Sequence, residues 1–437
     1  MKKVVLAIIT IILLFPSLNY GKSDDIVYKR IAVYPSIVPA VKVLETSLKY
    51  GWHANGKTYV FLVNEISQKD ILLGKLRNYD ALVIGASGRQ YLYGIDKLWK
   101  ERVRQFIASG GGYLGICGGA NEASMGYEKP SNAMDYLINK AVLRIANVYI
   151  NDDQDQEWQY LYKTAGIEGG VPIECRLLRH PIFEAYPNNT RIIRYEGGPG
   201  MYPANANDKL LGEIEPIAIY NEEPSEKAPL HHWYKKWGKW YMDGNITTDI
   251  KGQYAGIATT YGKGRIVLFG PHPEEITMIG GHVEEFPGRS KYTLFREKYL
   301  YRWTGGNYTS WGYNWWIVRR SMAWICGIDD MPSINDVVTI FRVPNNFMHM
   351  LYIDGRMIMP VPQNIVIGSI NIQAFVSNAE HVSFYVDGKL VKDVSSPPYT
   401  WKANLKGKHE IMIKAFDGNS FAYDEIEAYF ICAVLNK

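Results

Sequence analysis

The most informative segment of this chain is Gly111-Gly112-Tyr113-Leu114-Gly115-Ile116-Cys117-Gly118-Gly119-Ala120. Its apolar first half predicts a buried strand, and the Gly-x-Cys-x-Gly pattern that follows predicts a sharp turn into a helix, because glycines stand where side chains would clash. A thiol at such a turn lies at the N-terminus of the helix, whose dipole favours the thiolate, as does a nearby histidine. The stretch therefore predicts an α/β fold with Cys117 as a nucleophile.

A second apolar stretch, Gly264 to Phe269, leads into Gly270-Pro271-His272-Pro273-Glu274. It predicts another strand, which delivers a histidine and a glutamate on the turn that follows it. A thiol, a base and a group that orients the base are the parts of nucleophilic acyl transfer. The candidate catalytic residues are therefore Cys117, His272 and Glu274. Backbone N–H groups of Gly118, Gly85 and Ala86 are the candidate donors to the oxyanion.

Strand-like and helix-like segments alternate from residue 30 to residue 117. Strands are expected at 31–34, 57–63, 80–85 and 112–117, and helices at 38–50, 66–76 and 91–109. This alternation predicts a mostly parallel sheet with helices on both faces and with functional sites at the carboxyl ends of the strands. Cys117, the loop 85–88 and His272 all follow such ends.

The first residues predict export. Lys2 and Lys3 precede an apolar run from Val4 to Phe15, and small or polar residues then continue to Gly21. This order is typical of a secretory signal, so residues 1–21 are expected to be a signal peptide. A retained membrane anchor is the alternative. The protein is therefore expected to be secreted or at the cell surface.

Length and charge limit the number of domains and the kinds of partner that the protein can have. The chain has 437 residues, enough for two or three domains, and its formal net charge is only +4. Nucleic acid is not expected as a partner, since no basic stripe accompanies this small charge. If Cys117 stays a free thiol, at most one disulfide can form among Cys175, Cys326 and Cys432.

The middle of the chain is β-rich and holds two further motifs. Asp152-Asp153-Gln154-Asp155 lacks the later glutamate of a calcium loop and is interpreted as a solvated acidic turn, so no metal is predicted. The aromatic stretch 231–241 has two interpretations. It is either a platform on which sugars or bases stack, or a hairpin that turns at Gly238 with one aromatic face packed.

The C-terminal part follows a different pattern. Residues 304–359 are expected to be a Trp-rich connector, and residues 360–432 an Ig-like sandwich. Alternation in 370–375 and 382–386 predicts strands, and Asp387-Gly388 is a strong hairpin turn. Residues 352–358 echo this hairpin. The sandwich is expected to supply no catalytic group.

The chain resembles the class I glutamine amidotransferase-like superfamily and, within it, the domain found at the N-terminus of eukaryotic biotin-protein ligases. The resemblance covers residues of about 28–303, and its matching stretches are 31–34, 111–120, Tyr195-Glu196-Gly197-Gly198-Pro199 and 269–274. It implies a flavodoxin-like sheet, and a binding role for Glu196, Gly197 and Gly198. No biotin-ligase catalytic domain follows, so ligation of biotin is not implied.

Residues 360–431 resemble bacterial Ig-like modules, which implies a spacer or a contact with a cell surface or carbohydrate.

Two departures from these families bear on the site. The loop Gly85-Ala86-Ser87-Gly88 replaces the paired glycines of the superfamily, and Gly118 replaces the histidine that follows the cysteine in the peptidase-like branch.

Two functions remain open for this protein. One is an exported, cofactor-free hydrolase of amide or γ-glutamyl bonds in an unidentified small molecule or peptide. The other is a non-catalytic protein of the same fold that binds a ligand or docks at a surface.

Overall fold

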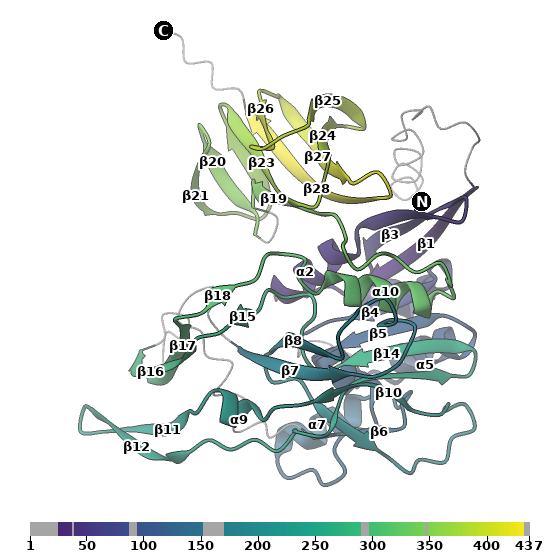
Figure 1. The fold of residues 1–437 in the computed structure, drawn as a ribbon, viewed down its shortest axis with the longest axis vertical. Helices are drawn as coiled ribbons and strands as arrows, with labels where there is room; N and C mark the ends of the chain where they lie inside the picture. The colour runs from purple at the N-terminus through teal and green to yellow at the C-terminus, as the bar shows by residue number, and fades with distance from the viewer. Residues whose placement is uncertain are drawn as a thin grey trace. The chain divides into compact units, whose positions relative to one another are not determined.

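The computed structural model describes residues 25–36, 39–86, 94–151, 170–289, 297–345 and 348–431. Strands predominate among these residues and helices are few (Figure 1). The chain divides into two compact units. Unit 1 contains Met1–Tyr28, Thr46–Leu62 and Asn335–Lys437, and unit 2 contains Lys29–Glu45 and Val63–Ile334. The expected signal peptide and the acidic turn at 152–155 lie outside the described residues.

Four parallel strands lie at the centre of unit 2. They are β1 (Asp25–Val33), β4 (Ala81–Ile84), β5 (Gly112–Ile116) and β14 (Gly264–Phe269), and each pairs in parallel with the next. Their ends are in register, since Val33 lies opposite Val83 and Phe269 lies opposite Ile116. The strands are apolar because helices cover both faces of such a sheet. Their carboxyl ends therefore meet at one edge.

Among the helices of this region, α5 (Lys97–Ala108) begins at a side-chain cap. The Asp96 carboxylate accepts the amides of Leu98 and Trp99 at 2.9 and 3.3 Å. The helix expected at 66–76 is two short ones, α3 (Gln68–Leu72) and the 3-10 helix η1 (Lys75–Asn78), because Gly74 between them has a φ of +73°. The others are α2 (Pro39–Leu48), α6 (Gly118–Ala123), α7 (Ala133–Ala141) and α9 (Pro224–Lys227).

Antiparallel strands extend the sheet beyond β14, so it is mixed. The extension runs through β13 (Tyr254–Tyr261), β10 (Glu215–Tyr220), β7 (Val171–Leu177) and β8 (Thr190–Tyr195). The shorter strands β9 (Gly200–Pro203) and β6 (Val148–Asn151) pair beside β13. Separate two-stranded ladders join β11 (His231–Lys236) to β12 (Lys239–Asn245), β15 (Met278–Ile279) to β18 (Asn307–Tyr308), and β16 (His282–Arg289) to β17 (Glu297–Thr304).

Unit 1 is a β-sandwich, as the C-terminal pattern predicts. One sheet contains β19 (Val338–Val343), β23 (Ile370–Ser377) and β26 (Thr400–Ala403). The other contains β20 (Met350–Ile353), β21 (Arg356–Pro360), β22 (Asn364–Ile367), β24 (His381–Val386), β25 (Lys389–Val394), β27 (Gly407–Phe416) and β28 (Ser420–Ile431). The expected turn at Asp387-Gly388 is present with φ of +47° and +79°, and Asp354-Gly355 forms a second such turn with φ of +45° and +78°.

Unit 1 also contains a hairpin from the start of the chain. Strands β2 (Tyr50–Ala54) and β3 (Lys57–Glu65) turn at Asn55-Gly56, and β2 pairs antiparallel with β28. Gly51 is required there, because a Cβ at that position would lie 2.3 Å from the Phe421 ring. The sequence predicts consecutive domains and does not predict β2. The compact units instead join residues that are more than 300 positions apart.

Part of the expected connector is a buried helix of unit 2. Helix α10 (Trp315–Ile325) follows the Trp-rich stretch, and Trp315, Ile317, Val318 and Met322 on it are buried. Arg265 on β14 donates from Nη1 to the carbonyl of Trp324 at 2.9 Å, which fastens the helix to the sheet. The connector is therefore not irregular, and its first part belongs to the core that carries the candidate site.

Candidate active site

Cys117 stands in the turn between β5 and α6, at the carboxyl edge of the parallel strands. Its φ and ψ are +54° and −110°, a conformation that costs a non-glycine residue about 1–3 kcal/mol. Its amide donates to the carbonyl of Phe269 at 2.8 Å, so the turn is tied to the end of β14. The thiol is free, and Cys117 is partly exposed. Helix α6 has only six residues, so its dipole contributes little to the thiolate.

Glycines let α6 start close to the sheet. A Cβ on Gly119 would lie 1.8 Å from the carbonyl oxygen of Ile84, at the end of β4. Tyr113 on β5 donates its hydroxyl to the carbonyl of Gly119 at 2.7 Å. The start of α6 therefore lies against the end of β4, where Gly85 and Ala86 follow. This brings the loops of Gly118, Gly85 and Ala86 together, while Ser87 and Gly88 lie outside the described residues.

His272 and Glu274 form a buried pair just after β14. The Nδ1 atom of His272 lies 2.9 Å from Oε1 of Glu274, and their side chains are 1% and 0% exposed. Burial works against a charged imidazole, but the negative charges of Glu274 and Cys117 outweigh it and raise the pKa of His272 well above its ordinary value. An imidazolium beside a cysteine favours the thiolate. The Nε2 atom of His272 is buried and makes no hydrogen bond of normal geometry within the described residues.

The turn that carries His272 is held from two sides. Its amide donates to the carbonyl of Arg194 on β8 at 2.7 Å. Trp315 at the start of α10 donates from its indole nitrogen to the carbonyl of Glu274 at 2.8 Å. These two bonds fix the backbone on either side of the histidine. Sequence reasoning missed both Arg194 and Trp315.

The Tyr-Glu-Gly-Gly-Pro segment lies beside the same turn. Glu196 is bound to the buried Arg194, with Oε1 2.6 Å from Nε, and Arg194 also donates to the carbonyl of Ile276 at 3.1 Å. Gly197 has a φ of +78°, and a Cβ on Gly198 would lie 1.8 Å from the carbonyl oxygen of Gly270. The segment thus fits closely against the end of β14. The charge of Glu196 is balanced inside the protein by Arg194.

Unit 2 contains two more buried acids. Glu275 follows Glu274, and burial raises its pKa although Arg194 opposes the shift. Glu122 on α6 is fully buried, and neither of its carboxyl oxygens has a hydrogen-bond partner among the described residues. Burial raises the pKa of Glu122 well above the ordinary value, which favours its neutral form. No motif in the sequence distinguishes Glu122.

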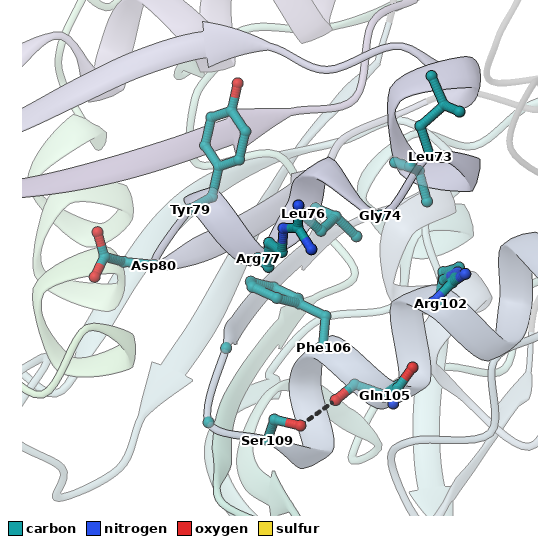
Figure 2. Close-up of a pocket in the computed structure, with 13 residues that line it drawn as sticks. Leu73, Gly74, Leu76, Arg77, Tyr79, Asp80, Arg102, Gln105, Phe106 and Ser109 are labelled. Carbon is teal, nitrogen blue, oxygen red and sulfur yellow. Dashed lines mark hydrogen bonds between the residues drawn. The ribbon is translucent and has the colours of Figure 1, made fainter.

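The other candidate features do not reach this site. A cavity of about 580 Å³ is lined by residues such as Arg77, Asp80, Arg102 and Phe106 (Figure 2). Asp80 and Gly111 precede β4 and β5, so this cavity lies at the opposite edge of the sheet from Cys117. Within the described parts of the chain, no group of three or more His, Cys, Asp or Glu side chains could hold a metal ion. Cys175 and Cys326 are free, and Cys432 lies outside the described residues.

Unit 2 is thus built on a mixed β-sheet with short helices, and unit 1 is a β-sandwich. The family model "Biotin-protein ligase, N terminal" matches residues 57–292, more than half of the chain. The chain belongs to the biotin-protein ligase N-terminal family. A second model, the bacterial Ig domain, matches residues 356–413. No curated protein matches the sequence.

Solved structures also resemble the chain at low overall scores. A protein of Bacteroides uniformis described as ThuA-like is 11% identical over 59% of this chain and 86% of its own, with a TM-score of 0.31. A Salmonella typhimurium protein described as cytoplasmic is 14% identical over 56% and 87%, with a TM-score of 0.30. The fibronectin(III)-like modules of Clostridium thermocellum CbhA are 26% identical over 17% and 93%, at 0.15.

Proposed function

We propose that this protein is an exported cysteine hydrolase that cleaves amide or γ-glutamyl bonds with Cys117, His272 and Glu274. The observation that carries the proposal is the strained Cys117 turn beside a buried His272–Glu274 pair. A nucleophile on a strained turn, a base and a carboxylate that orients the base are the parts that acyl transfer needs. The flavodoxin-like description of the parallel strands is part of the same proposal.

The reaction would proceed in two steps. The Cys117 thiolate attacks the carbonyl carbon, and backbone amides near Gly118, Gly85 and Ala86 stabilise the oxyanion. The C–N bond then breaks, and the amine leaves with a proton from His272, so that a thioester remains on Cys117. Water next gives a proton to His272 and attacks the thioester, which releases the carboxylic acid and restores the thiolate. Glu274 keeps Nδ1 of His272 protonated throughout.

Export and modularity are further parts of the proposal. Lys2, Lys3 and the apolar run to Phe15 support export, and so does the bacterial Ig domain match at 356–413. No helix among the described residues is long and apolar enough to span a membrane. The Ig-like region, residues 360–432, is proposed to supply no catalytic group, since Cys117, His272 and Glu274 all belong to unit 2.

The test uses purified full-length protein, the Cys117→Ala variant and the conservative Cys117→Ser variant. Chromogenic γ-glutamyl and aminoacyl amides are offered as substrates, and thiol labelling by iodoacetamide is measured in parallel. We expect amide cleavage by the unmodified protein and its loss in both variants. If no amide is cleaved while Cys117→Ala still binds the same compounds unchanged, the protein is a binding protein and the hydrolase proposal is wrong.

A further inference from the structure

A two-stranded arm of unit 2 carries exposed aromatic residues. The arm consists of β11 and β12, residues 231–245, and Figure 1 shows it as a thin ribbon that extends away from α9. It turns at Trp237-Gly238, with φ of +51° and +77°. Trp237 is 89% exposed, and Tyr234, Tyr241 and Met242 are 46%, 40% and 56% exposed. The hairpin expected at Gly238 is confirmed, but Tyr234, Trp237 and Tyr241 on it are exposed.

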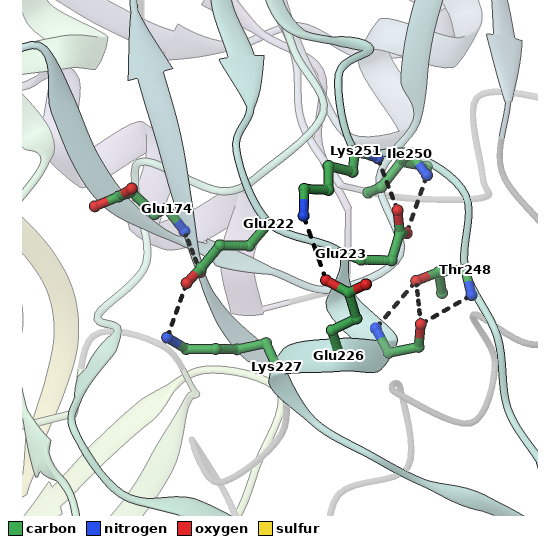
Figure 3. Close-up of polar contacts among 9 residues, drawn as sticks. Glu174, Glu222, Glu223, Glu226, Lys227, Thr248, Ile250 and Lys251 are labelled. Atoms are coloured by element: carbon green, nitrogen blue, oxygen red, sulfur yellow. Dashed lines mark hydrogen bonds and ion pairs between the residues drawn. The ribbon is translucent and has the colours of Figure 1, made fainter.

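The base of the arm is firmly held on both sides. The Glu223 carboxylate accepts the amides of Ile250 and Lys251 at 3.0 and 2.9 Å, which joins the residue before α9 to the segment after β12 (Figure 3). The hydroxyl of Ser225 accepts both the amide and the hydroxyl of Thr248, at 3.1 and 3.0 Å. These bonds close the loop from which the arm leaves.

A second anchor comes from β16. The Glu285 carboxylate accepts the amide of His231 at 2.6 Å and the indole N–H of Trp233 at 3.1 Å, and its Oε2 lies 2.9 Å from Nδ1 of His231. The polar ends of the aromatic residues at the base are therefore satisfied inside the protein. The exposed rings lie beyond this anchor, from Tyr234 to Met242, so the arm presents them to an outside partner.

Aromatic and basic side chains surround the tip on both faces. Tyr234 lies opposite Tyr241, and their rings stack at 5.6 Å. On the other face Lys235 lies opposite Trp240, with Nζ 5.9 Å from the ring. From Trp233 to Met242 the sequence has three lysines, Lys235, Lys236 and Lys239, and no acidic residue. Both faces of the tip therefore carry aromatic rings, and its charged side chains are lysines.

These features fit a lipid surface better than a sugar chain. A sugar site needs one flat aromatic face with hydrogen-bonding groups placed to fix the ligand. The tip offers rings on both faces, and its charged groups are all amines. Trp and Tyr rings settle at the level of lipid headgroups, and lysines extend towards anionic phosphates. We propose that the arm docks the protein on an anionic phospholipid bilayer, with Trp237 inserted among the headgroups.

The test compares vesicle binding by full-length variants. The vesicles contain phosphatidylcholine alone or mixed with phosphatidylglycerol, and bound protein is measured by co-sedimentation. Trp237→Asn removes the ring while it retains a turn residue that accepts positive φ. Tyr136→Ala, at an exposed aromatic residue outside the arm, is its control. We expect Trp237→Asn to lower partitioning into anionic vesicles by about tenfold, and Tyr136→Ala to leave it unchanged.

The charge of the tip is tested separately. Lys236→Gln and Lys239→Gln should each lower partitioning about fivefold, whereas Lys209→Gln, at an exposed lysine outside the arm, should not. A variant that carries both Lys236→Gln and Lys239→Gln has less charge at the tip. Added salt should therefore weaken the vesicle binding of the unmodified protein more than that of this double variant. Residues 4–15 are common to all variants, so differences among them report on the arm.

Three outcomes would overturn the proposal. The first is that Trp237→Asn and the lysine variants bind anionic vesicles as the unmodified protein does. The second is a Trp237-dependent affinity for soluble polysaccharide without vesicle binding, which would assign the arm to glycans. The third is Trp237-dependent self-association in sedimentation velocity, which would assign it to a second copy. Because amide cleavage by soluble protein does not involve the arm, failure here leaves the hydrolase proposal untouched.

Discussion

Both units contain charged side chains that are buried, but the two clusters differ in what surrounds them. In unit 2, His272 and Glu274 lie beside the partly exposed thiol of Cys117. In unit 1, Lys49 has Nζ 3.7 Å from the Asp424 carboxylate and 3.5 Å from that of Glu425, and its side chain is 1% exposed. The first cluster adjoins a cysteine on a strained turn. The second joins β2, from the start of the chain, to β28 near its end.

Buried charge alone therefore does not mark a catalytic site. Burial opposes charge in both clusters, and in each an opposite charge offsets the cost. In unit 1 the Asp424 carboxylate also accepts the amide of Phe341 at 3.0 Å, which ties three segments of the sandwich together. Chemistry requires in addition a group that substrate can reach. Substitutions in the two clusters should therefore have different effects, on thiol reactivity in unit 2 and on stability in unit 1.

The largest effect is expected at Glu274. Glu274→Gln removes the negative charge that raises the pKa of His272 and so weakens the imidazolium–thiolate pair. Iodoacetamide should therefore label Cys117 more slowly in the variant, because an imidazolium beside the cysteine favours the thiolate that reacts. Amide hydrolysis should fall by about 10²–10⁴-fold. Rates of labelling are measured against pH by mass spectrometry.

Glu122→Gln is the matched control for this experiment. Glu122 is also a buried acid of the same unit, but burial raises its pKa and favours the neutral form, which glutamine resembles. We expect the control to label and hydrolyse as the unmodified protein does. Equal losses in the two variants would mean that any change in a buried acid disturbs the site, and Glu274 would then have no specific role.

Next in size is the ion pair of unit 1. Asp424→Ala removes the buried carboxylate that lies beside Lys49 and accepts the amide of Phe341, and should lower the free energy of unfolding by about 3–5 kcal/mol. Urea denaturation followed by circular dichroism measures this loss. Lys408→Ala breaks an exposed pair with Glu427 in the same sandwich and should cost less than about 1 kcal/mol. Native Cys117 should label at an unchanged rate in both, which would distinguish structural from catalytic charge.

Lys414 in unit 1 should make stability depend on pH. Burial lowers the pKa of Lys414 from 10.5 to about 7. Between these values the unfolded chain binds a proton that the folded chain does not, so stability rises with pH across this window. Below it the cost of burying the charge is fully present. Lys414→Met should therefore stabilise the protein by roughly a few kcal/mol below the window and by less above it. A pH-independent effect of the substitution would contradict this.

The sequence predicts features that depend on neighbouring residues. The strand before Cys117, the strand before His272 and the turn at Asp387-Gly388 follow from local apolar runs and turn chemistry, and the structure has all three. The placement of Cys117 and His272 at strand ends follows in the same way, because parallel strands end at one edge. The catalytic roles of these residues remain proposals.

Features that depend on distant pairing were not predicted. The sequence has Asn55-Gly56, a strong hairpin signal, but nothing in 50–54 indicates that β28 is its partner. Arg194 was missed because its partners His272 and Ile276 lie about 80 positions away in the sequence. Helix α10 was missed because its polar residues Arg319, Arg320 and Ser321 are buried together with its apolar ones, so polarity does not separate an exposed face from a buried one.

The smallest effect is expected at Trp315, where α10 supports the catalytic turn. Trp315→Phe removes the indole N–H that donates to the carbonyl of Glu274 and leaves that buried carbonyl with one bond fewer. We expect a loss of about 1–3 kcal/mol in stability, together with slower labelling of Cys117, because Glu274 is then less firmly placed against His272. Trp316→Phe is the control: this neighbour is 3% exposed and stacks on Tyr186. It loses the same volume without a bond to the turn. If both variants lose stability equally and neither changes the pH dependence of labelling, α10 only fills space. If only Trp315→Phe shifts that dependence, the helix positions the site.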